Sequence, residues 1–239
     1  MHYKRWVIPD IHGCSKTLRS LIEKHIQPSR SDELIFLGDY IDRGPNSKGV
    51  IDYIMQLQKD EYAIKLLMGN HEEYCIKAWE EDKKKKKFFG LSFKTKTQKV
   101  WELHGGKETL QSFHVDFASE IPAFYIEWMR NTRLYIETDQ HILVHAGLNF
   151  KIDDPLTDHF AMLWTKEFIV IPSKIRNKMV IHGHTPVDIE FMHHVIKSNS
   201  YNFIDLDNGV YMTDRIGYGN LIAFELNSSE YVVQPNIDY

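Results

Sequence analysis

Five short clusters of aspartate, asparagine and histidine residues in this 239-residue chain could together bind divalent cations. Each cluster comes directly after a run of apolar residues. The clusters are Asp10-Ile11-His12-Gly13, Gly38-Asp39-Tyr40-Ile41-Asp42-Arg43-Gly44, Gly69-Asn70-His71-Glu72, His145-Ala146-Gly147 and His182-Gly183-His184-Thr185. Carboxylate, imidazole and amide ligands without a thiolate favour manganese, iron or zinc. The pattern therefore indicates hydrolytic chemistry at a metal site.

Taken singly, each cluster also has an ordinary structural explanation. An Asp-x-His sequence is usually a turn, His145 could be a buried core histidine, and Asp39 or Asp42 could cap a helix or a turn. The five clusters together favour the functional explanation, because a fixed series of polar clusters at predicted strand ends is hard to obtain from packing alone. Asp10 and His12 are two residues apart, so their side chains share one face of an extended strand, which suits two ligands of one metal. A single aspartate that bridges two cations would hold them about 3.5–4 Å apart, as in two-metal hydrolytic sites.

Strands and helices alternate in the first half of the chain, which predicts an α/β fold. Apolar runs predict strands over residues 4–9, 33–37 and 63–68, and helical spacing predicts one helix capped by Ser15 and another around residues 50–57. Further strands are expected over residues 141–144, 179–181, 203–206 and 221–226, with an edge strand over residues 231–233. Sites in α/β folds collect at the carboxyl ends of strands, where all five clusters fall.

Composition argues against several other classes of protein. A net charge of −4 gives no general attraction to nucleic acid or membranes, and no apolar run approaches the ~20 residues of a membrane helix. Two cysteines do not make a disulfide framework, so a cytoplasmic setting is expected. We expect a single domain over residues 1–239, with a lysine-rich surface excursion over residues 83–130. The run Lys83–Lys87 is either a solvated face or an electropositive rim that attracts anionic substrates.

The order of the five clusters resembles that of the phosphoprotein phosphatase family of calcineurin-like metallophosphoesterases, in particular its bacterial and phage branch of lambda protein phosphatase-like proteins. The similarity runs from Trp6 to about Leu226 and includes His104-Gly105-Gly106 before a helix. The resemblance implies an α/β, calcineurin-like fold, in which a two-sheet β-sandwich is flanked by helices in α-β-β-α layers. It also implies two divalent metal ions, with manganese expected in vitro and iron or zinc as alternatives.

The resemblance implies a ligand role for six residues of the clusters. Asp10 and His12 would bind one cation, and Asp39 would bridge it to the other. The ligands of the second cation would be completed by Asn70, His145 and His184.

The resemblance also implies catalytic and substrate contacts. His71 would act as a general acid toward the leaving alkoxide, oriented by Asp42, a role typically worth about 10²–10⁴-fold in rate. Arg43 would clamp the phosphate oxygens with its guanidinium fork. Lys166 stands where that branch usually has an arginine, and lysine keeps the positive charge but loses the bidentate geometry.

These implications predict a metal-dependent phosphatase that cleaves phosphomonoesters by in-line attack of a hydroxide bridging the two cations. The expected substrate is a phosphoprotein carrying phosphoserine or phosphothreonine, with phosphotyrosine or a small phosphoester as alternatives. A symmetrical dinucleoside tetraphosphate hydrolase, which shares Arg43-Gly44-Pro45, is the second hypothesis, although Asp42 and Glu72 favour the phosphatase. The third is a non-catalytic scaffold, disfavoured because no ligand is missing. The sequence indicates no nucleic-acid or membrane partner and no particular oligomeric state.

Overall fold

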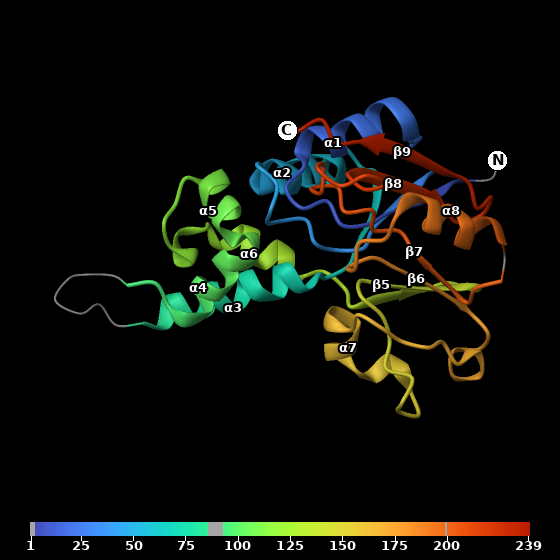
Figure 1. Cartoon of the computed structure of the whole chain (residues 1–239). Helices are drawn as coiled ribbons and strands as arrows, with labels where there is room; N and C mark the ends of the chain where they lie inside the picture. The colour runs from blue at the N-terminus through green and yellow to red at the C-terminus, as the bar shows by residue number, and fades with distance from the viewer. Residues whose placement is uncertain (1–2, 86–92, 199) are drawn as a thin grey trace.

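Two mixed β-sheets lie at the centre of the molecule, with helices on their outer faces (Figure 1). This computed structural model describes residues 3–85, 93–198 and 200–239. The strands of the first sheet lie in the order β3 (Ala63–Leu66), β2 (Glu33–Phe36), β1 (Arg5–Ile8), β8 (Asn220–Glu225) and β9 (Tyr231–Pro235). Those of the second sheet lie in the order β4 (Tyr135–Glu137), β5 (His141–Val144), β6 (Met179–His182) and β7 (Phe203–Asp205). The predicted α/β sandwich is confirmed, including the edge position of β9, whereas β4 was not anticipated.

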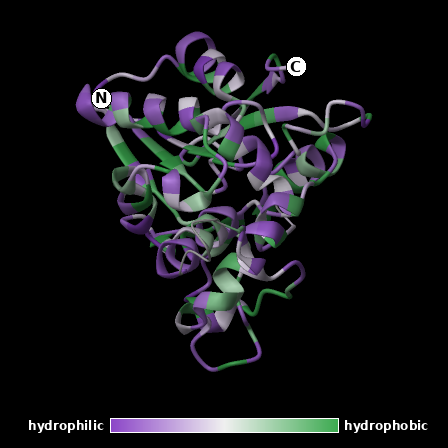
Figure 2. Ribbon diagram, turned by 90° about the vertical axis from the view of Figure 1, so that its left-hand side faces the viewer, coloured by the Kyte–Doolittle hydropathy of each residue, from purple (hydrophilic) through white to green (hydrophobic). Residues whose placement is uncertain are grey.

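The central strands β1, β2 and β5 are buried over nearly their whole length and are mostly apolar, because both faces of each sheet are covered. In β1, Val7 packs in the hydrophobic cluster between the two sheets, whereas Trp6 and Ile8 pack toward the helices on the outer face. In β5, Leu143 joins the cluster between the sheets and Ile142 faces the opposite way. Figure 2 shows the result, with hydrophobic strands in the interior and hydrophilic residues along the outer helices.

The parallel strands determine where the five clusters lie. β1, β2 and β3 pair in parallel in the first sheet, and β5, β6 and β7 pair in parallel in the second. The carboxyl ends of these strands therefore lie side by side within each sheet, and the loops that leave them carry the clusters. β4, β8 and β9 pair antiparallel at the remaining positions.

The two helices predicted in the first half of the chain are confirmed. The first, α1 (Ser15–Ser20), continues as the π-helical turn η1 (Leu21–Ile26), and the second is α2 (Ser47–Lys59). The other helical segments are α3 (Asn70–Lys84), α4 (Lys96–Trp101), η2 (Glu102–Gly106), α5 (Lys107–Phe113), η3 (Ala118–Glu120), α6 (Ala123–Arg130), η4 (Pro155–Thr157), α7 (His159–Trp164), η5 (Pro172–Ile175) and α8 (Ile189–Ser198). Within the described ranges, every helix is too short or too polar to cross a lipid bilayer.

The prediction that Ser15 caps the first helix is wrong. The hydroxyl of Ser15 accepts a hydrogen bond from the amide of Asn46 and makes no cap. The carboxylate of Asp238, from the other end of the chain, accepts the backbone N–H groups of Lys16 at 3.0 Å and Thr17 at 2.9 Å instead. A carboxylate at this position also suits the positive end of the helix dipole.

The described residues of the predicted surface excursion, 83–85 and 93–130, lie to one side of the sheets (green in Figure 1). α4 and α6 pack against α3, and α5 packs against α2. Trp101, Leu110 and Tyr125 from this segment are buried in the hydrophobic cluster that covers the first sheet. The end of the lysine run, Lys86 and Lys87, lies outside the described residues.

Candidate metal centre

Loops that leave the strand ends of both sheets meet at one buried site. The backbone N–H of His12 donates to the carbonyl of Asp39 at 2.9 Å, which joins the loops after β1 and β2. The second sheet closes on them, because the backbone N–H of His184 lies 3.1 Å from both carboxylate oxygens of Asp10. The structure places all six predicted ligand residues around this site, namely Asp10, His12, Asp39, Asn70, His145 and His184.

Backbone strain is concentrated in these loops. His12, Asp39, Asp42, Arg43 and His184 all have positive φ, between 44° and 75°. This left-handed region costs a non-glycine residue about 1–2 kcal/mol, and such strain persists where the surrounding structure enforces it, often at functional sites.

One group of donor atoms surrounds Asn70, the first residue of α3. Its amide oxygen Oδ1 lies 2.9 Å from Nε2 of His145 and 2.9 Å from Nδ1 of His184. Oδ1 of Asp39 lies 3.4 Å from Nε2 of His145. Asp39, His145 and His184 each offer a ligand atom within 4.8 Å of the others, so together with Asn70 they could hold a metal ion.

The chemistry of this group fits a cation. Nδ1 of His145 donates its proton to the carbonyl of Leu37 at 3.0 Å, so Nε2 of the neutral ring carries a lone pair. Burial lowers the pKa of His145, and burial together with the nearby His145 lowers the pKa of His184 to about 3, so both rings are neutral at pH 7. Nε2 of His145 and Oδ1 of Asn70 are then two acceptors facing each other across 2.9 Å. Facing lone pairs repel, whereas a cation beside them would be bound by both.

A second group surrounds the other oxygen of Asp39. Oδ2 of Asp39 lies 3.6 Å from Nε2 of His12 and 3.8 Å from Nε2 of His71. His12 bonds through Nδ1 to the carbonyl of Ile41 at 3.0 Å, which leaves its Nε2 facing the site. Burial would raise the pKa of Asp39, but His145, His71 and His12 outweigh burial when they are protonated and lower it. Asp39 therefore loses its proton at a lower pH than these rings do, and its carboxylate is charged at pH 7. Because its two oxygens face the two groups, Asp39 has the geometry of a bridging ligand.

The side chain of Asp10 lies beside this second group, and the loop after β6, in the second sheet, holds its carboxylate in place. The close contact between Asp10 and this loop requires glycine at position 183, because a Cβ atom there would lie 2.1 Å from Oδ2 of Asp10. Burial, and then the nearby carboxylates Asp207 and Asp39, raise the pKa of Asp10. Buried carboxylates so close to one another require positive charge nearby to remain ionised.

Asp42 and His71 form a buried pair next to the second group. Oδ2 of Asp42 lies 2.6 Å from Nδ1 of His71. Both oxygens of Asp42 have further partners, since the indole of Trp101 donates to Oδ2 at 2.8 Å and the hydroxyl of Thr109 donates to Oδ1 at 2.6 Å. Burial opposes protonation of His71, but the carboxylates of Asp39 and Asp42 outweigh burial and raise its pKa. Asp42 thus fixes the orientation of the ring, in an arrangement that suits a proton donor. Trp101 and Thr109, which the sequence did not single out, hold Asp42 in place.

Arg43 extends its guanidinium into the same site. Nη1 lies 2.8 Å from Nε2 of His12, and Nη2 lies 3.1 Å from Nε2 of His71. The guanidinium carbon lies 4.4 Å from the ring centre of Tyr211. The backbone N–H of Arg43 donates to the carbonyl of Gly105 at 3.1 Å, and a Cβ atom on Gly105 would lie 2.6 Å from that nitrogen. The predicted glycine pair before α5 therefore determines where Arg43 points.

Glu72 stabilises the loop that carries Asp39. Its fully buried carboxylate accepts the backbone N–H groups of Asp39 at 2.8 Å, Tyr40 at 2.9 Å, Ile41 at 3.3 Å and Gly69 at 3.0 Å. Burial and then Asp39 raise the pKa of Glu72 to about 8, while these N–H donors favour the carboxylate form. The side chain thus connects the loops after β2 and β3.

Replacing Glu72 by glutamine should lower the free energy of unfolding of the metal-free protein by about 1–3 kcal/mol, because the new amide would point N–H groups at buried N–H donors. Urea denaturation in the presence of a chelator measures the effect. Glu81→Gln, the same change at an exposed position of α3, should alter the free energy by less than about 0.5 kcal/mol. Equal free energies of unfolding for the two variants would show that Glu72 does not stabilise this loop.

A cavity of about 280 Å³ opens beside these groups. Arg43 and the predicted phosphate contact Lys166 both line it, and aromatic rings form much of its wall. The ring centres of Tyr74 and Trp164 are 5.6 Å apart in an edge-to-face arrangement. The complete lining consists of Arg43, Asn70, His71, Tyr74, Trp101, His104, Trp164, Lys166, His184, Thr185 and Pro186.

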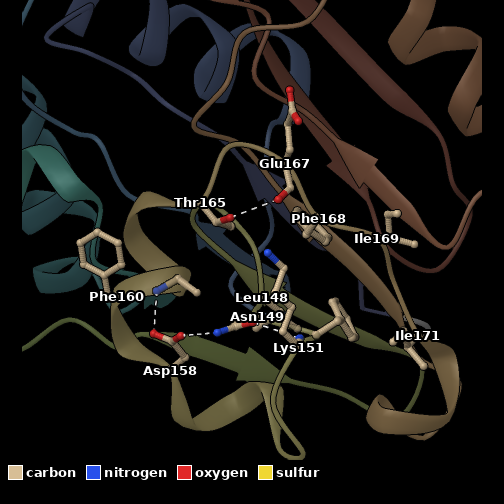
Figure 3. A pocket seen from close by; sticks show the side chains of 12 residues that line it. Leu148, Asn149, Lys151, Asp158, Phe160, Thr165, Glu167, Phe168, Ile169 and Ile171 are labelled. Atoms are coloured by element: carbon tan, nitrogen blue, oxygen red, sulfur yellow. Dashed lines mark hydrogen bonds between the residues drawn. The ribbon is translucent and has the colours of Figure 1, made fainter.

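A larger hollow of about 850 Å³ is lined in part by residues between 165 and 171 (Figure 3). Lys166 lines the smaller cavity, whereas its neighbour Glu167 lines the larger hollow together with apolar side chains such as Phe168 and Ile169. Among the described residues, the hollow is lined by none that belongs to the five clusters. Size alone therefore does not mark the reactive site in this molecule.

Comparison with known families accounts for the convergence of the clusters. Residues 3–188, more than half of the sequence, match the family of calcineurin-like phosphoesterases. The chain belongs to the calcineurin-like phosphoesterases. The superfamily predicted from the five clusters is confirmed.

Two curated relatives of the phosphoesterase are named bis(5'-nucleosyl)-tetraphosphatases. The symmetrical enzyme of Buchnera aphidicola subsp. Schizaphis graminum is 29% identical over 161 residues, which are 66% of this chain and 49% of the relative. The asymmetrical enzyme PrpE of Oceanobacillus iheyensis is 29% identical over 208 residues, which are 76% of each chain. The phosphoesterase thus aligns with about half the length of the first relative. Neither relative carries the name of the phage-type protein phosphatases expected from the sequence.

A crystal structure with a provisional assignment as a diadenosine tetraphosphatase has the same fold as this phosphoesterase. The TM-score is 0.62, the aligned regions cover 98% of this chain and 94% of the other, and 17% of residues are identical. At this level of identity, the likeness establishes the fold and leaves the substrate to be argued from the site itself.

Proposed function

We propose that this phosphoesterase hydrolyses dinucleoside tetraphosphates, the second hypothesis drawn from the sequence. The observation that carries the proposal is a single cavity lined by donors of the candidate metal centre, two basic side chains and several aromatic rings. The names of the two curated relatives support the same substrate class. One relative is symmetrical and the other asymmetrical, so the position of cleavage is part of the test.

The aromatic wall suits a nucleobase. The ring of Tyr74 lies 5.6 Å from that of Trp164 and 6.0 Å from that of His104, measured between centres. Trp164 is fixed in place because its indole N–H donates to Glu73 at 2.8 Å. Stacking of a base on an aromatic side chain is worth about 1–3 kcal/mol. A phosphoserine side chain has no ring to occupy such a wall, and this difference favours a nucleotide.

The phosphate chain would lie over two divalent cations, with manganese expected and iron or zinc as alternatives. Asp39 would bridge them through its two oxygens, which face the two groups of donors. The other ligands would be Asp10 and His12 on one side and Asn70, His145 and His184 on the other. When bound, the cations supply Lewis acidity toward phosphate oxygens and make a water-derived nucleophile available near neutral pH.

The side chains around the cations would bind phosphate and deliver a proton. The guanidinium of Arg43 offers a fork that matches two phosphate oxygens, and Lys166 adds a second positive charge to the cavity. His71 lines the same cavity, and Oδ2 of Asp42 lies 2.6 Å from its Nδ1. His71 would therefore protonate the leaving oxygen as the bond to phosphorus breaks.

The proposal predicts that kcat/KM with Mn²⁺ is higher for diadenosine tetraphosphate than for a phosphoserine peptide. Trp164→Ala should lower kcat/KM for the tetraphosphate about 5- to 100-fold, because a stacking surface is lost, and leave the peptide rate unchanged. Phe191→Ala, an aromatic truncation on α8 outside the cavity, is the matched control. Chromatography of the products distinguishes two molecules of ADP from ATP plus AMP. A preference for the peptide, with no effect of Trp164→Ala, would contradict the proposal.

A phosphoprotein phosphatase is the second candidate, and the pair of Asp42 and His71 favours it. Their 2.6 Å contact holds a proton donor in place. Such a donor helps most when the leaving group is a strongly basic alkoxide, as in a phosphoserine ester, and less when it is a phosphate oxygen. The substrate comparison above therefore decides between the two candidates.

A further inference from the structure

Arg43 and His104 line two neighbouring spaces on the surface of the molecule. One is the 280 Å³ cavity beside the candidate metal centre. The other, which we call the Tyr211 hollow, has a volume of about 430 Å³ and is lined by Arg43, Glu102, Leu103, His104, Gly105, Glu108 and Tyr211. Within the described part of the chain, the 850 Å³ hollow shares no lining residue with the cavity. The Tyr211 hollow, in contrast, adjoins the cavity at the side chain expected to bind phosphate.

Tyr211 lies beside two groups of the candidate metal centre. It belongs to the loop between β7 and β8. Its ring centre lies 4.4 Å from the guanidinium carbon of Arg43 and 5.0 Å from the ring centre of His12, with the two ring planes at 90°. The side chain is half-buried and lines the hollow, so part of it is accessible. An aromatic ring is therefore available next to Arg43 in the hollow, in addition to the rings that line the cavity.

A dinucleoside tetraphosphate needs two surfaces for its two nucleosides. The aromatic wall of the cavity, with Tyr74 and Trp164, suits one base. Because the phosphate chain joins the two nucleosides, a chain bound at Arg43 carries one nucleoside on each side of that residue. The second nucleoside therefore has to leave the cavity past Arg43, where the Tyr211 hollow begins.

The lining of the Tyr211 hollow suits a nucleoside better than a phosphate. Tyr211 and Leu103, which is 84% exposed, offer apolar surface to a base. The carboxylates of Glu102 and Glu108 can accept hydrogen bonds from the hydroxyls of a ribose, and they repel phosphate. The charges thus favour the phosphate chain at Arg43 and an uncharged group in the hollow.

We propose that the Tyr211 hollow binds the second nucleoside of a dinucleoside tetraphosphate, with the base against Tyr211 and Leu103. This inference rests on the proposed function and deepens it, because it assigns a place to each end of the substrate. A compound with a single nucleoside needs only the cavity. The hollow should therefore matter for diadenosine tetraphosphate and much less for adenosine tetraphosphate.

Inhibition constants of these two compounds test the inference. Both should compete with p-nitrophenyl phosphate, so their constants can be measured whether or not they are cleaved. Tyr211→Ala should raise the constant of diadenosine tetraphosphate about 5- to 100-fold relative to that of adenosine tetraphosphate. Leu103→Ala should raise the same ratio at least about 3-fold. Ile169→Ala is the matched control and should leave the ratio unchanged, because Ile169 is also 84% exposed but lines the 850 Å³ hollow.

The outcomes separate this inference from the proposed function. Equal weakening of both compounds in Tyr211→Ala would show that Tyr211 only holds Arg43, and it would overturn the inference, as would an unchanged ratio in both variants. A raised ratio in Ile169→Ala alone would place the second nucleoside in the 850 Å³ hollow instead. If circular dichroism shows that Tyr211→Ala is unfolded, Leu103→Ala decides, because its side chain is exposed. A wild type that binds diadenosine tetraphosphate without cleaving it contradicts the proposed function and still tests the hollow.

Discussion

Replacing His71 by asparagine should slow hydrolysis strongly and leave both cations bound. His71 lines the cavity and its Nδ1 lies 2.6 Å from Oδ2 of Asp42, so the ring is placed to give a proton to the leaving oxygen. Loss of a general acid lowers kcat by about 10²–10⁴-fold. The loss should be largest for an alkyl phosphate, because its alkoxide leaves poorly without a proton. It should be smaller for p-nitrophenyl phosphate and for a tetraphosphate, because their leaving groups are weakly basic.

Steady-state kinetics together with the metal content of the purified variant check this prediction. His114→Asn is a suitable control, because His114 is exposed at the end of α5 and lies outside the lining of the cavity. The structure also supplies the competing explanation, since His12, Asp39 and His71 offer ligand atoms within 4.8 Å of one another. A His71→Asn protein that binds only one ion would show that His71 is a metal ligand and that the proton comes from elsewhere.

Asp39→Asn should bind no more than one cation and lose activity to the level of the chelator-treated wild type. The two oxygens of Asp39 face His12 at 3.6 Å and His145 at 3.4 Å, so each serves one group of donors. Asparagine has one oxygen, and it also removes the negative charge that the surrounding histidines stabilise. Two-metal sites contribute several kcal/mol of transition-state stabilisation, which corresponds to at least about 10³-fold in rate.

The measurement is Mn²⁺ stoichiometry and activity before and after chelation. Returning Mn²⁺ should restore the wild type but not Asp39→Asn. Asp139→Asn changes an exposed aspartate in the same way and should behave as the wild type. Two tightly bound ions in Asp39→Asn would show that the bridge lies elsewhere.

Much of the fold and of the site follows from local patterns. The apolar runs before Asp10, Asp39 and His145 predicted β1, β2 and β5 to within about two residues at each end, because a strand buried on both faces must be apolar throughout. Once the strands were assigned, parallel pairing was sufficient to bring Asp10 and Asp39 together. His145 reaches them only because the second sheet packs against the first.

The remaining parts depend on contacts between distant residues, which a single sequence does not reveal. Trp101 and Thr109 complete the partners of Asp42 across 59 and 67 residues, and neither belongs to a recognisable motif. The cap of α1 was assigned to Ser15 because it is adjacent, whereas the actual cap is Asp238, more than two hundred residues away.

The ligand loops come from different layers of the molecule, with Asp39 and Asn70 following strands of the first sheet and His145 and His184 following strands of the second. An ion held by all four would cross-link the two layers without a covalent bond. Binding of this kind stabilises a folded protein by about 2.7 kcal/mol when the free ion is at one hundred times its dissociation constant. The resistance of this protein to heat would therefore vary with the supply of divalent metal around it.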